Sequence, residues 1–301
     1  MASSSDRLPA AAFTLVPASR RASIAAKLIV AAGSITRPIH GKGHWHLARL
    51  AAALATPDQR VSLRLGAGGQ FLFPMRDPYW SRFLLGSARY EPEVESTLRA
   101  AAHLNFSFYD CGANFGYWSA FCTGLGCRRV VAVEASESTC RFLAENARAN
   151  GFTALHRALH SRSGIVVRID EDQPHAGRHV DFESDSGGNV ETISIDDLVG
   201  DDPGPLIVKL DVEGQEIAAF AGARRTARKP ALFIYEDHGK DPASKCTQWI
   251  LANTDLTVSF VDGDGTCHSI DSAADASAFK KRSRHGYNFI AASPDWRKST
   301  G

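Results

Sequence analysis

Residues that could bind a small molecule and move a proton recur at four places in the sequence, each after a short apolar segment. In chain order they are Asp110, Gly112, Asn114 and Gly116; Glu134; Asp211 and Glu213; and Glu236, Asp237 and His238. A carboxylate or an imidazole beside a bound alcohol acts as a general base and removes its proton. Glycine lets the backbone turn tightly against a ligand. The pattern therefore predicts a binding site in which acidic side chains handle a proton.

The spacing of the first two places indicates the class of cofactor. Glu134 follows the glycine turn by about 20 residues, the distance at which nucleotide-binding α/β proteins place an acid on the ribose hydroxyls. The turn has only Gly112 and Gly116, so the three-glycine pattern of dinucleotide folds is missing, as is a Walker loop. Asp110 would repel a pyrophosphate and attract a cationic sulfonium. The residues favour S-adenosylmethionine over NAD.

The elements that must position these residues alternate between apolar strands and amphipathic helices. Such alternation predicts a parallel sheet covered on both faces. Ligands of open parallel sheets bind beyond the carboxyl ends of the strands, where all four places fall. We expect strands at 106–111, 129–134, 153–159, 165–169, 206–212, 231–235, 256–261 and 287–292, and helices at 114–125, at 136–150 and before Gly222.

Length and composition predict one large domain with an appendage. The 301 residues are 44% hydrophobic, enough for a sizeable core. Residues 1–60 are rich in alanine and arginine and have helical patterning, so we expect an N-terminal helical extension. The catalytic domain is expected at 61–301, with a β-hairpin and lid at 61–105 and a Rossmann-like core at 106–295.

Three motifs resemble the FkbM family of S-adenosylmethionine-dependent methyltransferases. They are Asp110-Cys-Gly-Ala-Asn-Phe-Gly-Tyr117, Val131-Ala-Val-Glu134 and Val208-Lys-Leu-Asp-Val-Glu-Gly-Gln-Glu216, and the lead-in Arg89-Tyr-Glu-Pro-Glu-Val94 is also similar. The resemblance covers about residues 60–290. It implies the Rossmann-like fold of class I methyltransferases, a seven-stranded and mostly parallel sheet with helices on both faces. It also implies O-methylation of sugars, polyketides or other small metabolites.

The resemblance assigns roles to the cofactor-binding residues by position. It places Asp110, Gly112, Asn114 and Gly116 at the methionine end of S-adenosylmethionine, and Glu134 at the ribose. Arg157 and Ala158, which follow the third strand of the core, would lie at the adenine edge.

The later strand ends supply the candidate catalytic residues. Methyl transfer is an in-line displacement, so the enzyme must align the acceptor and remove the proton of an alcohol. Asp211, Glu236 and His238 are the candidate bases. Capping of the next helix is the alternative role for Asp211 and Glu213. Asp211, Glu236 and Asp237 could also hold magnesium, but a metal is not favoured, and no metal ligand is predicted.

Charge and cysteine content restrict the partners. The net charge of +1 provides no global field for nucleic acid or an anionic membrane, and no segment has transmembrane length. Arg20 and Arg21 before an apolar run look only loosely like a twin-arginine signal. Six cysteines without a Cys-x-x-Cys pair indicate reduced thiols and a cytoplasmic protein. We expect a small-molecule or glycan-type acceptor; a homo-oligomer is left open.

Three other functions remain open from the residues alone. An N-methyltransferase acting on a small amine would use the same fold. A noncatalytic S-adenosylmethionine-binding protein is suggested by the alanine-rich extension. A nucleotide-dependent oxidoreductase is disfavoured by the absent third glycine.

Overall fold

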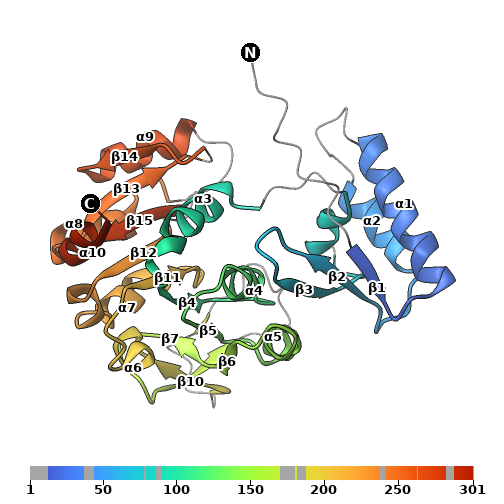
Figure 1. Cartoon of the computed structure of the whole chain (residues 1–301), viewed down its shortest axis with the longest axis horizontal. Helices are drawn as coiled ribbons and strands as arrows, with labels where there is room; N and C mark the ends of the chain where they lie inside the picture. Colours follow the sequence, from blue (N-terminus) through green and yellow to red (C-terminus); the bar gives the residue numbers. More distant parts are fainter. Residues whose placement is uncertain are drawn as a thin grey trace. The chain divides into compact units, whose positions relative to one another are not determined.

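The computed structural model divides the chain between Arg89 and Tyr90 into two compact units. It describes residues 13–36, 44–77, 79–85, 90–169, 180–181, 188–237, 241–262, 264–282 and 288–300. Figure 1 colours the first unit in blue and the second from green to red. The sequence predicted a boundary at residue 60, so the hairpin expected to belong to the catalytic domain lies in the first unit.

The first unit combines a small antiparallel sheet with two helices. Its sheet has the order β1-β2-β3, and the β2–β3 hairpin is the one predicted at 61–74. The first strand was not predicted, and it pairs with β2 through Phe13 opposite Leu63. A two-stranded hairpin is marginal alone, so this third strand explains why the unit begins before residue 60. The elements are β1 (Phe13–Val16), α1 (Arg20–Thr36), α2 (His44–Ala52), β2 (Arg60–Arg64), β3 (Gln70–Pro74) and η2 (Trp80–Leu85).

An eight-stranded sheet forms the centre of the second unit. Its order is β14-β13-β15-β12-β11-β4-β5-β6. Five neighbouring strands from β6 to β12 run parallel, and β15 is antiparallel to both of its neighbours. The strands are β4 (Ser107–Cys111), β5 (Arg129–Glu134), β6 (Thr153–His156), β11 (Leu206–Leu210), β12 (Ala231–Glu236), β13 (Thr257–Val261), β14 (Cys267–Ile270) and β15 (Asn288–Ala292). The predicted Rossmann-like α/β fold is confirmed, with β14 as one strand beyond the expected seven.

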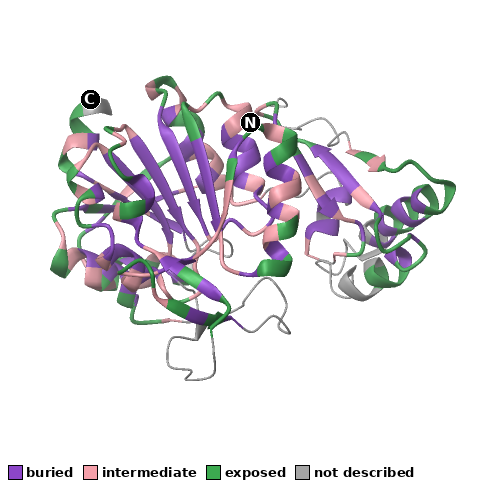
Figure 2. Cartoon of the chain, turned by 90° about the horizontal axis from the view of Figure 1, so that it is seen from below, coloured by how far each residue is buried: buried purple, intermediate pink, exposed green. Residues whose placement is uncertain are grey.

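Helices lie on both faces of this sheet (Figure 2). Successive side chains of a strand point to opposite faces. Tyr109 of β4 packs with the face that carries α6, α7 and α8, whereas Asp110 bonds to Ser119 of α4 on the other face. The helical elements of this unit are α3 (Pro92–Ala101), η3 (Ala102–Leu104), α4 (Tyr117–Gly124), α5 (Glu137–Asn150), α6 (Ile195–Val199), α7 (Glu216–Ala221), η4 (Thr226–Arg228), α8 (Lys245–Asn253), α9 (Ala273–Arg282) and α10 (Pro294–Thr300).

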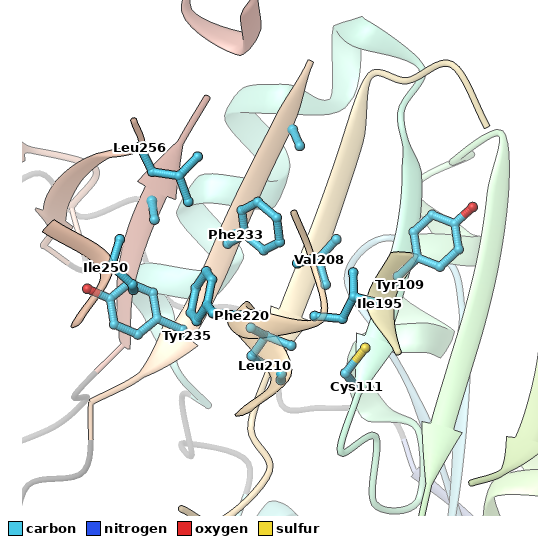
Figure 3. Close-up of a cluster of buried hydrophobic side chains, with 14 of the residues drawn as sticks. Tyr109, Cys111, Ile195, Val208, Leu210, Phe220, Phe233, Tyr235, Ile250 and Leu256 are labelled. Carbon is cyan, nitrogen blue, oxygen red and sulfur yellow. The ribbon is translucent and has the colours of Figure 1, made fainter. Parts of the chain in front are cut away.

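The core beneath α6, α7 and α8 is built from large apolar side chains of the central strands. Figure 3 shows Val208 and Phe233 beside Phe220 of α7. The rings of Phe220 and Phe233 are 5.2 Å apart, and those of Phe220 and Tyr235 are 5.5 Å apart and edge-on. Burial of such rings contributes the largest favourable term to folding. This core fixes β4, β11 and β12, and with them the loops at their carboxyl ends.

The predicted strand at 153–159 is divided between two sheets. Its first part, β6, pairs with β5, and its second part pairs with Thr192 and Ile193 of a separate small sheet. That sheet has the order β7-β10-β8-β9. The chain therefore leaves the main sheet after His156. The small sheet comprises β7 (Ala158–Leu159), β8 (Val166–Ile169), β9 (Val180–Asp181) and β10 (Val190–Ile193).

Two further observations concern the surroundings of the protein. None of the helices within the described ranges combines the length and the apolar composition needed to cross a membrane. All six cysteines are free thiols, three of them buried.

Candidate active site

The loop after β4 packs directly on the loop after β11. Gly112 has a φ of +80°, and a Cβ at this position would lie 1.8 Å from the carbonyl oxygen of Asp211. The N–H of Asp211 donates to the carbonyl of Cys111 at 3.0 Å. Only glycine tolerates this approach. The sequence suggested that Gly112 makes room for a ligand; in the structure the neighbour that requires glycine is Asp211.

Asp110 holds α4 on the sheet. Its side chain is 1% exposed and accepts a hydrogen bond from the hydroxyl of Ser119 at 2.6 Å. Burial raises the pKa of Asp110, and the positive charge of Lys209 opposes that rise. The carboxyl group therefore lies beneath the glycine turn, against the first turns of α4.

The turn that follows Gly112 depends on two positive φ angles. Asn114 has a φ of 52°, and its side-chain oxygen accepts from the N–H of Phe115 at 2.8 Å. Gly116 precedes α4 with a φ of +87°. A Cβ on Gly116 would lie 2.7 Å from Cδ1 of Leu143 on α5. Gly116 thus permits close packing of the turn against α5.

Glu134 joins the ends of β4 and β5. Its Oε2 accepts from the N–H of Asn114 at 2.9 Å, and its Oε1 accepts from the N–H of Ser136 at 2.9 Å. The side chain is half-buried, and a carboxylate has lone pairs beyond the two used here. Its geometry is fixed before any ligand arrives. Glu134 can therefore accept further hydrogen bonds from a pair of hydroxyl groups.

The two residues predicted at the adenine edge differ in accessibility. Arg157 is 42% exposed, bonds the carbonyl of His156 at 2.8 Å and lies 3.3 Å from a carboxylate oxygen of Glu191. Ala158 has no exposed surface and packs with Val167 and Val190 inside the small sheet. The methyl group of Ala158 is thus covered by protein, whereas the Arg157 side chain is open to solvent.

A buried lysine lies among the acidic residues. The side chain of Lys209, 3% exposed, places Nζ 2.9 Å from Oδ2 of Asp211 and 4.0 Å from Oε2 of Glu91. The charges of Asp211, Glu91 and Asp110 raise the pKa of Lys209 despite its burial. The cation therefore stays charged and offsets several carboxylates at once.

Asp211 and Glu236 are neighbours at the ends of two parallel strands. Leu210 of β11 lies beside Tyr235 of β12, so the next residue of each strand falls at the same edge. Burial, the charge of Asp211 and a side-chain hydrogen bond to Asp211 raise the pKa of Glu236 to about 9. At neutral pH Glu236 is therefore protonated and donates to the Asp211 carboxylate. The predicted convergence of these two residues is observed.

Glu91 completes this cluster and was not predicted. It precedes α3 with a φ of 42° and makes no side-chain cap bond to that helix. Its Oε2 instead accepts from Nε1 of Trp118 at 2.6 Å. Burial raises the pKa of Glu91, and Lys209 opposes the rise. In the sequence Glu91 is one residue of the lead-in motif Arg89 to Val94, and nothing local relates it to Lys209.

The remaining predicted acids have other roles or lie outside the described residues. Asp237 is buried and accepts from Thr247 at 3.1 Å and from Nζ of Lys280 at 2.7 Å. It therefore supports α8 and α9 and does not join Asp211 and Glu236, as the magnesium hypothesis required. His238 lies outside the described residues.

The turn between β11 and α7 is closed by a different acid from those expected. Oε1 of Glu216 accepts from the N–H groups of Val212 at 3.3 Å and Gly214 at 3.2 Å. Asp211 and Glu213 were the residues considered for capping. Glu216 supplies these bonds, which leaves the Asp211 carboxylate directed to Lys209 and Glu236. No set of three potential metal ligands gathers in the part of the chain that the structure describes.

Known proteins resemble this chain over the region that contains these residues. A family model, the methyltransferase FkbM domain, matches residues 110–256, a range that contains every predicted site residue. The hexuronic acid methyltransferase AglP of Haloferax volcanii is 30% identical over 197 residues, which span 60% of this chain and 81% of that protein.

Two solved structures are more distant. An O-methyltransferase from Bacillus cereus in complex with SAH has a TM-score of 0.38 and 14% identity, covering 68% of this chain and 82% of that chain. Cofactor-bound Rv0187 from MTB has a TM-score of 0.37 and 13% identity, covering 68% of this chain and 81% of that one.

Proposed function

This chain is a methyltransferase of the FkbM family, and from that premise we propose that it methylates a hydroxyl group of a sugar-type acceptor. The observation that carries the proposal is the Asp211–Glu236 pair, held by Lys209 at the edge of the sheet next to the glycine turn. A carboxylate at this place suits deprotonation of an alcohol.

The residues beside the pair fit the cofactor of the family. When bound, S-adenosylmethionine supplies a methyl group activated by a sulfonium. Glu134, fixed by the N–H groups of Asn114 and Ser136, would accept the ribose hydroxyls. The turn from Gly112 to Gly116 would receive the methionine end, and the nearby carboxylates favour its cationic groups. Arg157 is the residue we assign to the adenine edge; Ala158 could contribute only its backbone.

Asp211 is our candidate for the base that accepts the acceptor proton. Its side-chain oxygen accepts the hydrogen bond that protonated Glu236 donates, so Asp211 is the ionised member of the pair. Lys209 stabilises its negative charge. Glu236, protonated at neutral pH, would hold the base in place through the single proton that it donates to Asp211. His238, two positions further along the chain, remains the third candidate.

A uronic acid is the acceptor class we propose to test first. The support is the named activity of the AglP relative, a hexuronic acid methyltransferase, and the alignment with it extends over 81% of that protein. The free thiols support the further proposal that the reaction takes place in the reducing cytoplasm.

The test is incubation of the full chain with S-adenosylmethionine and, separately, with hexuronic acid glycosides, neutral hexosides and amino sugars. A product heavier by one methyl group, with its position on a hydroxyl oxygen established by fragmentation, supports the proposal; a methyl group on the carboxyl oxygen would contradict it. Methylation of the amine alone would replace it with N-methylation. A parallel series with a chelator and with added magnesium tests the metal: equal rates in both would exclude a metal-dependent mechanism.

A further inference from the structure

The first compact unit exposes apolar side chains that methyl transfer does not use. Among the described residues eight large hydrophobic side chains are exposed, and all but Val166 fall between residues 16 and 54. Leu50 is 71% exposed and Leu54 is 50% exposed. Such a concentration marks an interaction surface. The seven residues are Val16, Ile24, Leu28, Val30, Leu47, Leu50 and Leu54.

Most of these side chains follow helical spacing on α1 and α2. Ile24 and Leu28 are one turn apart on α1, and the opposite face of α1 is buried through residues such as Ala25 and Ile29. Leu47 and Leu50, three residues apart, also share one face of α2, which packs against α1. The helices at the right of Figure 2 accordingly alternate buried purple with exposed green. We call the exposed side chains of these two helices the α1–α2 surface.

The segment that carries the α1–α2 surface is strongly basic. From residue 7 to residue 57 it has seven Lys or Arg residues and no Asp or Glu. Taking these seven from the 34 basic residues of the whole chain leaves 27, against all 33 acidic residues, for the rest. The net charge of +1 therefore hides a separation of charge. The seven are Arg7, Arg20, Arg21, Lys27, Arg37, Lys42 and Arg49.

Cations lie next to the exposed apolar side chains. Arg20 precedes Ile24 by one helical turn, and Lys27 adjoins Leu28, with both basic side chains exposed. Long basic side chains can lay their methylene groups along an apolar surface and keep the charge in the polar layer above it. An interfacial helix on an anionic membrane needs this combination.

Other occupants match only part of the surface. Nucleic acid would use the cations but not the aliphatic side chains, since its recognition rests on phosphate contacts. A second copy would bring the same basic residues against themselves in a symmetric interface. An anionic bilayer complements both features, because the apolar side chains enter the boundary of the acyl chains and the cations meet the lipid headgroups.

We infer that α1 and α2 dock this protein on an anionic membrane surface, with both helices lying in the interface. This surface is independent of the acceptor and of the residues assigned to methyl transfer. α1 has 17 residues with Lys27 in its interior, so it fits a helix that lies on a bilayer better than one that crosses it.

The test measures binding of the full chain to vesicles of phosphatidylcholine alone and of an equal mixture with phosphatidylglycerol, by cosedimentation. We expect binding to the mixed vesicles that weakens as salt is added, and little binding to the neutral ones. Leu28→Ser with Leu50→Ser, and separately Arg20→Gln with Lys27→Gln, should each lower the partition coefficient by about tenfold or more.

Control variants carry comparable changes elsewhere. Among the described residues Val166 is the one exposed large hydrophobic side chain outside the segment, and Val166→Ser removes it; Arg148→Gln with Arg224→Gln removes two exposed cations of the second unit. These controls should bind mixed vesicles as the unchanged chain does, and circular dichroism checks that every variant is folded. If the serine variants unfold, Arg20→Gln with Lys27→Gln still tests the inference.

Several results would overturn the inference. They are failure of the unchanged chain to bind mixed vesicles, equal binding to neutral vesicles, and equal losses in variants and controls. The surface would be assigned to self-association if the unchanged chain does not bind vesicles and light scattering shows that it forms a dimer. Leu28→Ser with Leu50→Ser would then convert the dimer to a monomer. Binding to a duplex DNA probe in place of vesicles would assign it to nucleic acid.

Discussion

Nζ of Lys209 lies 2.9 Å from Oδ2 of Asp211, two residues further along the chain at the end of β11. Residues two apart in an extended chain point to the same side, so the bond joins the strand to the loop that follows it. The same ammonium group faces Glu91 and Asp110. One buried cation thus holds together acids from three elements, and the site depends on it.

Replacement of this cation should destabilise the fold. In Lys209→Met the surrounding carboxylates lose their counter-charge in a buried place, so we expect the free energy of unfolding to fall by about 3 to 5 kcal/mol. Urea unfolding at neutral pH measures the change. Lys298→Met is the control, since Lys298 pairs with Asp295 at the surface and should cost less than about 1 kcal/mol. Equal losses in the two variants would contradict the role of Lys209.

Asp211 and Glu236 should differ in their effect on turnover. Asp211→Asn removes the proposed base, and we expect the rate constant to fall by about 100- to 10,000-fold with cofactor affinity largely kept. Glu236→Gln keeps a hydrogen-bond donor next to Asp211, so its loss should be smaller. Single-turnover rates on an established acceptor make the comparison, together with His238→Ala. A larger loss in Glu236→Gln or in His238→Ala than in Asp211→Asn would move the base to that residue.

The raised pKa of Glu236 predicts a specific dependence of stability on pH. The folded protein keeps a proton on Glu236 up to about pH 9, whereas the unfolded chain releases it near 4.5. Since the folded state binds more protons in this window, Glu236 lowers the free energy of unfolding as the pH rises from about 4.5 to about 9.

Glu236→Gln cannot ionise, so its stability should fall less across that window than the stability of the unchanged chain. Urea unfolding at a series of pH values measures the difference between the two. Glu137→Gln, a change at the exposed start of α5, should leave the slope unaltered. Parallel curves for the unchanged chain and Glu236→Gln would show that Glu236 is ionised in the folded protein.

The sequence was sufficient for the sheet and for the strand ends. The central strands are mostly apolar on both faces, and the glycine turn after β4 and Glu134 at the end of β5 have the expected spacing, so the edge of the sheet could be predicted from local pattern. The pairing of Phe13 with Leu63 was not predictable, because the partners are 50 residues apart and each strand is short. The division of 153–159 into two strands has the same cause, since β7 is defined by its partner Thr192.

The charge contacts of the site could not be predicted without the fold. Lys209 lies in the same motif as Asp211, but nothing in its neighbours shows that it is buried or that Glu91 faces it. Asp237 follows Glu236 directly and looked equivalent to it. It is oriented to Lys280 because alternate side chains point to opposite sides. The sequence pattern locates acids near the edge of the sheet. Which of them can bind a ligand or a proton depends on the side chains that contact each acid in the fold.

Glu134 should control cofactor affinity. If its carboxylate binds the ribose hydroxyls, Glu134→Ala loses charged hydrogen bonds, and the loss of a single one, about 1.5 to 3 kcal/mol, lowers affinity at least about tenfold. Calorimetry with S-adenosylhomocysteine measures the change. Glu137→Ala lies three residues away on an exposed helix turn and should bind as the unchanged chain does. Unaltered affinity in Glu134→Ala would leave its carboxylate with a structural role, as a bridge between Asn114 and Ser136.

Gly112 should be irreplaceable because of its close contact with the Asp211 carbonyl, and a comparison with Gly126 separates this contact from the effect of a positive φ. In Gly112→Ala the new Cβ would meet the Asp211 carbonyl at 1.8 Å, whereas at Gly126, with a φ of +85°, nothing lies within 4 Å of a Cβ. Gly126→Ala should therefore cost only the backbone strain of about 1 to 2 kcal/mol. Gly112→Ala must also push apart the loops after β4 and β11, so we expect a loss above about 4 kcal/mol, or failure to fold. Thermal and urea unfolding measure the loss of stability in the two variants. Equal losses would mean that the loops separate without cost and do not hold Asp211 in position.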